Sequence, residues 1–230
     1  MFKAVIFDIG QTLVEYNKPL DWSSLYRPAL EYAADQCKYK LSERQYEMAI
    51  EVLSKYNTRI NPRDYEVSSD AIFSEIMCFL NLPLEKLSAV KYNFYSFFKR
   101  ESRLFSDVEE TLSILADRQI LMGTLTDVAY GMDNEYALED ISAIKKYIAY
   151  PITSIDVGYR KPRIDGLILL AKKMKVNVSE IVYVGDEEKD MLCANNAGVF
   201  SVLINRGEEI KHYGQKKQIK SLMELLEIVM

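Results

Sequence analysis

Histidine and cysteine are scarce in this 230-residue sequence, which excludes several kinds of catalytic site. The single histidine, His212, lies near the C-terminal end among lysine and tyrosine residues, where we expect a surface position. One isolated histidine argues against both a His-rich zinc site and Ser-His-Asp catalysis. The three cysteines, Cys37, Cys78 and Cys193, are odd in number and widely spaced. We therefore expect free thiols in a cytoplasmic protein.

Long hydrophobic runs and basic clusters are also missing. No run approaches the length of a membrane span, and the first apolar run contains an aspartate and lacks a cleavage pattern, so we expect no signal peptide. The formal net charge is −5, and the charged residues, 27% of the chain, have both signs interspersed. Such a chain has no basic patch to displace the counterions of nucleic acid. We expect neither nucleic acid nor a membrane as a partner.

The opening segment, residues 3–13 with the sequence K-A-V-I-F-D-I-G-Q-T-L, places one carboxylate, Asp8, in an apolar run. The run predicts a strand buried on both faces, and Gly10 and Thr12 then turn the chain. In an open parallel α/β sheet, the ligand crevice lies at the carboxyl ends of the strands. Asp8 is therefore a first candidate for chemistry, although an isolated aspartate at this place is also a common turn residue.

Amphipathic helices are predicted before residue 101, and alternating strands and helices after residue 107. Between residue 17 and about residue 101 there is no strand signal. The four helices predicted there have apolar faces made of Leu25, Ala29, Tyr32 and Ala33; Tyr46, Ile50 and Leu53; Ile72, Phe73, Ile76, Met77 and Leu80; and Leu87, Val90, Phe94, Phe97 and Phe98. Later strands are expected at residues 120–125, 152–155, 181–184 and 200–204, and helices within 107–115, 134–147, 164–174, 191–197 and 222–229. Because a lone buried strand cannot satisfy its backbone, the opening strand must join the later sheet. The helical region is then an insertion, and the fold class is α/β with a parallel sheet.

Polar residues follow several of these strands. Asp8, Thr126-Asp127 and Asp186 each come at the end of an apolar strand, and Lys161 precedes a proline at a further junction. If the strands are parallel, these groups meet at one edge of the sheet, in the crevice.

The charges of this set indicate a chemistry. Asp8, Asp186 and Asp190 would crowd together, and clustered carboxylates need a cation or raised pKa values. Carboxylate oxygens suit Mg²⁺, and a threonine hydroxyl, turn N–H groups and an ammonium group suit a phosphoryl group. The pattern favours phosphoryl transfer to a carboxylate nucleophile. The sequence contains no G-x-x-x-x-G-K-[ST] loop, which excludes a P-loop nucleotide hydrolase.

Four segments together resemble the motifs of the haloacid dehalogenase superfamily. They are D-I-G-Q-T at residues 8–12, L-T-D at 125–127, G-Y-R-K-P at 158–162 and G-D-E-E-K-D at 185–190. They occur in the order of that family, and the helical insertion lies between the first and second motifs, where the family has its cap. The resemblance implies a Rossmann-like three-layer core at residues 1–16 and 102–230 and an all-α helical-bundle cap at 17–101.

The resemblance also implies roles for individual residues. Asp8 would be the nucleophile that forms an aspartyl-phosphate. Mg²⁺ would be held by Asp8, the main-chain carbonyl of Gly10 and Asp186, with Asp190 in support.

The other two motifs would serve the phosphoryl group. Thr126 and the backbone of Asp127 would bind phosphate, and Lys161 would neutralise both the nucleophile and the transferred group. Arginines of the insertion could meet an anionic substrate, although exposed positions are the simpler expectation for Arg27, Arg59 and Arg63.

Gly10 departs from the pattern of the phosphatases in this family, most of which have a second aspartate two residues after the nucleophile. That aspartate protonates the leaving oxygen and later activates water, a contribution of roughly 10²–10⁴ in rate. Three alternatives follow: a substrate with a good leaving group, a substitute such as Glu15, Gln11 or a cap residue, or a slow protein that serves to bind.

The leading hypothesis is a Mg²⁺-dependent phosphatase that acts on a small phosphorylated metabolite. One alternative is a 2-haloacid dehalogenase, which also uses an aspartate nucleophile but needs no metal. The other is a catalytically weak binding or regulatory protein. The sequence leaves open whether the chain is a monomer or a homodimer.

Overall fold

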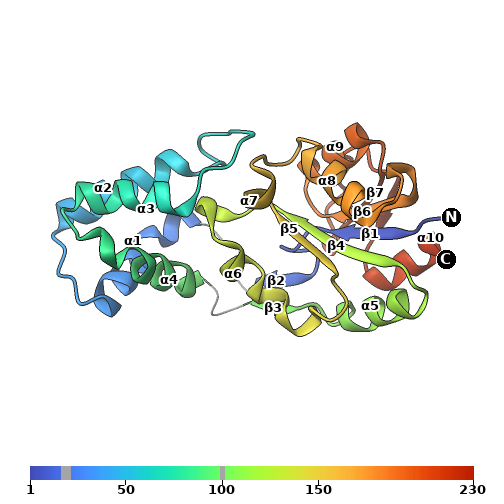
Figure 1. The fold of residues 1–230 in the computed structure, drawn as a ribbon, viewed down its shortest axis with the longest axis horizontal. Coiled ribbons are helices and arrows are strands. Elements are labelled where there is room, and N and C mark those ends of the chain that lie inside the picture. The colour runs from blue at the N-terminus through green and yellow to red at the C-terminus, as the bar shows by residue number, and fades with distance from the viewer. Residues whose placement is uncertain (17–21, 99–101) are drawn as a thin grey trace.

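The structure, a computed structural model, describes residues 1–16, 22–98 and 102–230. Figure 1 shows a helical block at one end of the molecule and a sheet core, which contains both termini, at the other. The four predicted helices of the block are present as α1 (Trp22–Gln36), α2 (Glu43–Tyr56), α3 (Ser69–Phe79) and α4 (Leu87–Phe98), with a short 3-10 turn, η1 (Leu84–Lys86), before α4. The sequence Asn17-Lys18-Pro19 predicts a turn, which lies outside the described residues. The predicted domain boundaries, after residues 16 and 101, lie at the edges of the segments 17–21 and 99–101, which are not described.

The core is built around a six-stranded sheet with the order β5-β4-β1-β6-β7-β8, in which every neighbouring pair is parallel. Its strands are β1 (Ala4–Phe7), β4 (Leu121–Thr126), β5 (Tyr150–Thr153), β6 (Ile181–Gly185), β7 (Phe200–Ile204) and β8 (Lys217–Ile219). The opening strand lies in the middle, between β4 and β6. The predicted α/β fold with a parallel sheet is therefore confirmed.

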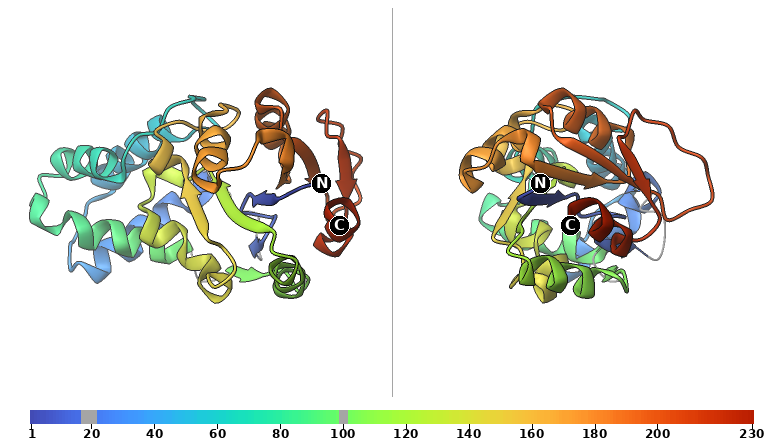
Figure 2. Two further views of the ribbon diagram at one scale, coloured as in Figure 1. Left: turned by 45° about the vertical axis from the view of Figure 1, so that its right-hand side comes forward. Right: turned by 90° about the vertical axis from the view of Figure 1, so that its right-hand side faces the viewer.

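Helices cover both faces of the sheet (Figure 2) because successive side chains of a strand point to opposite sides. Val5 and Phe7 of β1 pack in one apolar cluster, and Ala4 and Ile6 pack in another. The first cluster lies under α5 (Val108–Asp117), η6 (Leu222–Leu225) and α10 (Leu226–Val229). The second lies under α8 (Asp165–Met174) and α9 (Glu188–Ala197), and η5 (Val178–Glu180) precedes β6.

The structure differs from the prediction at several places, among them the closing helix expected at 222–229, which is divided into the 3-10 turn η6 and α10. The strand expected at residues 152–155 ends at Thr153, because the Thr153 side chain accepts the N–H of Ile155 and starts the short helix α7 (Ser154–Val157). The helix expected over 134–147 is divided into α6 (Asn134–Ala137) and the 3-10 turn η4 (Glu139–Ile144). The edge strand β8 was not predicted, because Ile219 is its one buried residue and it lacks an apolar pattern.

A second, two-stranded antiparallel sheet lies where the chain leaves and re-enters the core. It pairs β2 (Val14–Tyr16) with β3 (Ser102–Leu104). The alternation of side chains along β2 points Glu15 and Tyr16 to opposite sides of this ribbon.

The apolar core of the helical block includes a segment from the sheet core. Val128, Tyr130 and Met132, which follow β4 around the 3-10 turn η3 (Ala129–Gly131), pack among the side chains of α1, α3 and α4. Gly131 has φ +62°, and a Cβ there would lie 1.9 Å from the carbonyl oxygen of Val67. The backbone after β4 therefore lies directly against the loop that leads into α3.

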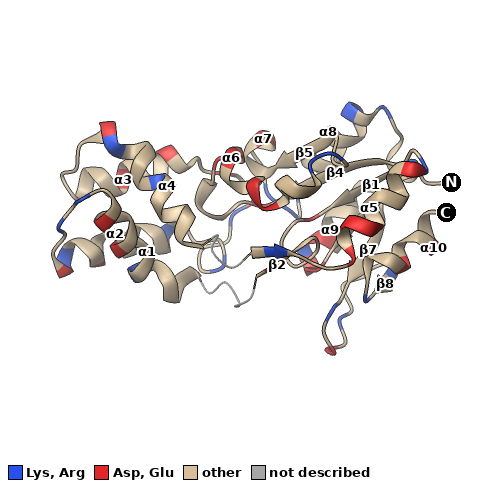
Figure 3. Ribbon diagram, turned by 90° about the horizontal axis from the view of Figure 1, so that it is seen from below, with Lys and Arg blue, Asp and Glu red and all other residues tan. Residues whose placement is uncertain are grey.

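Acidic and basic residues are interspersed over both parts of the molecule (Figure 3). His212 is exposed, as expected. No helix in the described part of the chain has the length and apolarity needed to span a membrane.

Asp107 links three distant parts of the core. Its carboxylate accepts two hydrogen bonds from the guanidinium of Arg206, at 2.9 and 3.0 Å, and others from the Ser221 hydroxyl and the Leu222 N–H. Arg206 also donates to the carbonyl of Thr12, in the turn after β1. Burial acts to raise the pKa of Asp107, but these donors outweigh it and hold the pKa below its ordinary value of 3.8.

We expect Asp107→Asn to lower the free energy of unfolding by about 1–3 kcal/mol at neutral pH, because it removes a charge-assisted pair of hydrogen bonds. The pKa of Asp107 is lower in the folded protein than in the unfolded chain. Its ionised carboxylate therefore stabilises the fold above pH 3.8, and this stabilisation is lost as the pH falls through the folded-state pKa. Urea denaturation at several pH values should therefore show a difference from the wild type that narrows below pH 3.8. Asp117→Asn, at the exposed end of the same helix, is the matched control. An equal decrease of the free energy of unfolding in both variants would contradict the stabilising role of Asp107.

Candidate active site

Asp8 is the first residue after β1, in the middle of the sheet edge. Its backbone N–H donates to the carbonyl of Val184 on β6 at 2.8 Å, which fixes the end of β1 against its neighbour. The chain then turns through residues 11–13, where Gln11 has φ 55°. The Asp8 carboxyl group is buried and lines a cavity of about 1080 Å³.

Lys161 joins Asp8 to the end of β6. It lies between α7 and α8, and its Nζ is 2.7 Å from Asp8 Oδ1 and 2.6 Å from Asp190 Oδ1. It also donates to the Tyr183 hydroxyl at 3.1 Å and to the Leu125 carbonyl at 3.3 Å. With 2% of the side chain exposed, burial acts to lower the pKa of Lys161, but the charges of Asp190 and Asp8 outweigh it and raise the pKa well above its ordinary value. These contacts favour the charged ammonium form of Lys161.

Asp190 holds the turn that carries Asp186. Its Oδ2 accepts the backbone N–H groups of Asp186 at 3.1 Å and Glu187 at 2.9 Å, as a capping box at the start of α9. A Cβ at Gly185 would lie 2.5 Å from this carboxyl group, so a glycine is required at the end of β6. Both Asp190 oxygens are thus engaged, one by Lys161 and the other by the turn.

The carboxylates of Asp8, Asp186 and Asp190 form a group that could hold a metal ion. Each offers an oxygen, and these atoms lie within 4.8 Å of one another. Burial raises the pKa of Asp186 to about 8, and the charges of Asp8 and Asp190 contribute to the rise. Burial also raises the pKa of Asp8, to about 6. Clustered carboxylates of this kind are stabilised by a nearby cation, and hard oxygen donors of this kind fit Mg²⁺.

Thr126 and Asp127 lie at the end of β4 and line the same cavity as Asp8. Asp127 Oδ1 accepts the backbone N–H of Lys161 at 3.0 Å, and Oδ2 is 3.1 Å from Lys189 Nζ. Burial acts to raise the pKa of Asp127, but Lys161 and Lys189 outweigh it and lower the pKa. The side chain of Asp127 therefore holds the Lys161 loop in place.

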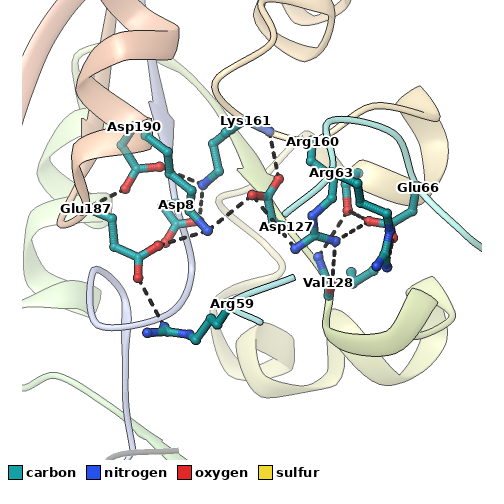
Figure 4. A network of polar contacts seen from close by, with 12 residues as sticks. Asp8, Arg59, Arg63, Glu66, Asp127, Val128, Arg160, Lys161, Glu187 and Asp190 are labelled. Atoms are coloured by element: carbon teal, nitrogen blue, oxygen red, sulfur yellow. Dashed lines mark hydrogen bonds and ion pairs between the residues drawn. The ribbon is translucent and has the colours of Figure 1, made fainter. Parts of the chain in front are cut away.

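The structure thus brings the predicted residues to one place. Asp8, Gly10, Thr126, Asp127, Lys161 and Asp186 all line the cavity, and Asp190 lies buried directly behind them. The helical block supplies the facing wall, which includes Trp22, Tyr56, Asn57, Arg59, Arg63 and Phe98. Figure 4 shows the polar network that extends from Asp190 and Asp8 through Asp127 to Arg160, Glu66 and Arg63.

Gly10 has room for a side chain. A Cβ there would have Tyr16 Cε2 as its nearest neighbour, at 3.7 Å, which is ordinary contact. The Tyr16 hydroxyl donates to Asp140 Oδ2 at 3.0 Å, and both residues line the cavity. Glu15, on the opposite side of the ribbon, pairs with Arg103 at 2.7 Å. Glu15 is therefore not placed to substitute for an acid at position 10.

Sequence reasoning missed several residues of this network. The sequence pattern places Tyr183 in an apolar strand, but its hydroxyl donates a hydrogen bond to the Leu125 carbonyl at 3.0 Å, beside Lys161. Lys189 lies inside the fourth motif and pairs with Asp127 and Glu187. Its position between acidic residues in the sequence could have indicated such an ion pair. Glu66 and Arg160 are 94 residues apart and form a buried ion pair that no local pattern predicts.

The three arginines of the insertion have different surroundings. Arg27 forms ion pairs with Glu31 and Glu43 on the surface of the helical block. Arg59, with 81% of its side chain exposed, reaches Glu187 at 3.2 Å. Arg63 is buried in the cavity wall, which contradicts the expectation of an exposed position.

Comparison with curated proteins finds similar phosphatases. The chain is 28% identical over 213 residues to the glyceraldehyde 3-phosphate phosphatase of Methanopyrus kandleri, which covers 90% of this chain and 86% of that protein. It is 32% identical over 132 residues to a phosphoglycolate phosphatase of Vibrio parahaemolyticus, which covers 56% of this chain and 57% of that protein.

Comparison with solved structures finds the same fold. The 2-haloacid dehalogenase of Pseudomonas syringae pv. Tomato DC3000 has a TM-score of 0.71 and 19% identity, over 100% of this chain and 98% of that chain. A HAD phosphatase from Thermococcus onnurineus has a TM-score of 0.65 and 21% identity, over 99% of this chain and 98% of that chain. The sequence also matches the family described as haloacid dehalogenase-like hydrolase over residues 2–198. The resemblance predicted from the four motifs is therefore confirmed: this chain is a hydrolase that belongs to the haloacid dehalogenase-like hydrolase family.

Proposed function

We propose that this hydrolase is a Mg²⁺-dependent phosphatase that acts on a small phosphorylated metabolite through an aspartyl-phosphate on Asp8. The observation that carries the proposal is the position of Asp8, with its carboxylate 2.7 Å from Lys161 Nζ and within 4.8 Å of oxygens from two further aspartates. A nucleophilic carboxylate beside a fixed cation suits attack on a dianionic phosphoryl group. The curated relatives of known name, a glyceraldehyde 3-phosphate phosphatase and phosphoglycolate phosphatases, support the same reaction class.

In this mechanism an Asp8 oxygen attacks phosphorus, and the bond from phosphorus to the leaving oxygen breaks. Lys161 stabilises the negative charge of the transferred group, and the Thr126 hydroxyl and the Asp127 backbone bind its other oxygens. Water then attacks the phosphorus of the aspartyl-phosphate, which releases phosphate and restores the Asp8 carboxylate.

The metal would be held by Asp8, the Gly10 carbonyl and Asp186. When bound, Mg²⁺ would neutralise the carboxylates and draw negative charge from the phosphoryl oxygens. Because both Asp190 oxygens accept hydrogen bonds or pair with Lys161, we assign Asp190 the supporting position. A 2-haloacid dehalogenase has no use for such a group of aspartates, which favours the phosphatase over that alternative.

The helical block, residues 17–101 by our division of the chain, would act as the cap of this site. Its side chains form the cavity wall that faces Asp8, so it would limit the access of water during the reaction. The free state of Cys37, Cys78 and Cys193 supports a cytoplasmic location.

We expect p-nitrophenyl phosphate or acetyl phosphate to release phosphate in the presence of Mg²⁺, and EDTA to abolish the release. Asp8→Asn should lose at least about 10³-fold in kcat, because an amide is not a nucleophile for this step. Asp117→Asn, an equal change of charge on an exposed helix end, should retain full activity. Activity that persists in EDTA would overturn the metal mechanism, and Mg²⁺ binding without turnover of any phosphate ester would favour a binding or regulatory protein.

Gly10→Asp should accelerate hydrolysis of esters with poor leaving groups by roughly 10²-fold, because it restores a general acid and base beside Asp8. The substitution is sterically allowed, since the nearest atom to the new Cβ is 3.7 Å away. Gly10→Ala is the control for side-chain bulk without acidity. Rapid-quench measurement should find a longer-lived aspartyl-phosphate in the wild type than in Gly10→Asp. An unchanged or lower rate in Gly10→Asp would show that another group already fills the role.

A further inference from the structure

Glu66 is a buried carboxylate that the helical block contributes to the loops of the sheet core. It belongs to the loop between α2 and α3, and 3% of its side chain is exposed. Its backbone N–H donates to the carbonyl of Gly158 at 2.9 Å, in the loop that carries Lys161. A carboxylate at this depth is unfavourable unless hydrogen bonds and an opposite charge satisfy it. The partners of its side chain are therefore important to this region of the fold.

One oxygen of Glu66 has two donors from the sheet core. Oε2 accepts hydrogen bonds from the Ser154 hydroxyl at 2.6 Å and from Arg160 Nη1. Oε1 accepts the N–H of Val67 at 3.1 Å, within the same loop as Glu66. Ser154 is the first residue of α7, and Arg160 directly precedes Lys161. A single carboxylate oxygen of the helical block therefore joins two segments of the core.

Ser154 and Arg160 both contact the backbone of Val128. The N–H of Val128 donates to the Ser154 hydroxyl oxygen at 3.0 Å, and the carbonyl of Val128 accepts a hydrogen bond from Arg160 Nη1 at 2.8 Å. The one proton of the serine hydroxyl is donated to Glu66, and the two protons of Arg160 Nη1 serve Glu66 and Val128. Both backbone groups of Val128 are thus linked to one oxygen of Glu66, and Figure 4 shows the part that passes through Arg160.

Val128 directly follows the residues that we propose bind phosphate. The β4–β5 ladder ends at Thr126, and Asp127 and Val128 come after it. The side chain of Asp127 accepts the backbone N–H of Lys161 at 3.0 Å. The peptide group between Asp127 and Val128 is therefore held on one side by the Lys161 loop and on the other by Ser154.

On the basis of the proposed phosphatase function, we propose that Glu66 is a positioning residue for the phosphate-binding backbone. It acts through the Ser154 hydroxyl and the Arg160 guanidinium group, which hold the two backbone groups of Val128. The adjoining backbone of residues 126–127 is then oriented toward the phosphoryl oxygens before substrate binds, which avoids a cost of reorganisation. In the described structure neither Glu66 nor Ser154 lines the cavity, so this role needs no contact with the substrate.

The contacts of Glu66 are separate from the proposed metal site. Asp8 follows β1 and Asp186 follows β6, whereas Ser154 begins α7 and Arg160 lies after it. Loss of the Glu66 contacts should therefore weaken phosphate binding more than Mg²⁺ binding. A general loosening of the fold would weaken both, so the two affinities together distinguish positioning from overall stability.

Ser154→Ala tests this link with little disturbance of folding, because it removes one hydroxyl and leaves no charge unpaired. We expect the kcat/KM for p-nitrophenyl phosphate to fall roughly 10-fold and the inhibition constant of inorganic phosphate to rise by a similar factor. Acetyl phosphate should show the same loss, because the two esters share the phosphoryl group. The Kd of Mg²⁺, measured by calorimetry, should stay close to that of the wild type. Equal losses of phosphate and Mg²⁺ affinity would contradict the proposal.

Glu66→Gln removes the charge and leaves one acceptor oxygen, so it should also raise the inhibition constant of inorganic phosphate. Because Glu66→Gln and Ser154→Ala weaken the same chain of hydrogen bonds, the double variant should lose little more than Glu66→Gln alone. Glu66→Asp restores the charge at a shorter reach and should recover part of the affinity. Glu47→Gln, at an exposed glutamate of α2, is the matched control. Fully additive losses in the double variant would contradict a shared route to Val128.

The positioning role can also be tested without turnover. Calorimetry of inorganic phosphate with the wild type in Mg²⁺ should show tighter binding than with Ser154→Ala or Glu66→Gln. A wild type that binds phosphate but releases none from any ester would overturn the proposed function alone. Wild-type phosphate affinity in both Ser154→Ala and Glu66→Gln would overturn the role of Glu66 alone.

Discussion

A buried ammonium group shared by two carboxylates holds this active site together. Lys161 contacts Asp8 at the end of β1 and Asp190 on α9, and its other contacts, Tyr183 and Leu125, belong to β6 and β4. An unpaired ammonium group at this depth would be strongly unfavourable, and so would either carboxylate alone. The same interaction that keeps the Asp8 carboxylate in place therefore also links three strand ends and a helix start.

The two ends of the cavity have opposite electrostatic requirements. Near Asp8, three aspartates face one lysine, so this end is surrounded by more negative charge. At the facing wall, Arg63 and Arg160 share Glu66, so that end is surrounded by more positive charge. The two ends of the cavity thus differ in charge.

Sequence reasoning could place the strand ends but not the facing wall. A parallel strand buried on both faces is visible as an apolar run, and a topological rule brings the residues after such runs to one edge; Asp8, Thr126 and Asp186 were found in this way. Arg63 and Glu66 belong to a loop whose partner, Arg160, is more than 90 residues away, and no periodicity connects them. The edge strand β8 was missed for a related reason, since a mostly exposed strand has no apolar pattern to detect.

The segment after β4 connects the helical block directly to the loop of Thr126 and Asp127 beside Asp8. Thr126 and Asp127 are followed within a few residues by Tyr130, whose ring lies 5.4 Å from that of Trp22 and whose carbonyl accepts a hydrogen bond from the Tyr95 hydroxyl. The block cannot swing away from the sheet without breaking these contacts or pulling on the loop beside Asp8. Substitutions deep in the helical core would therefore change the position of the Thr126-Asp127 backbone beside Asp8.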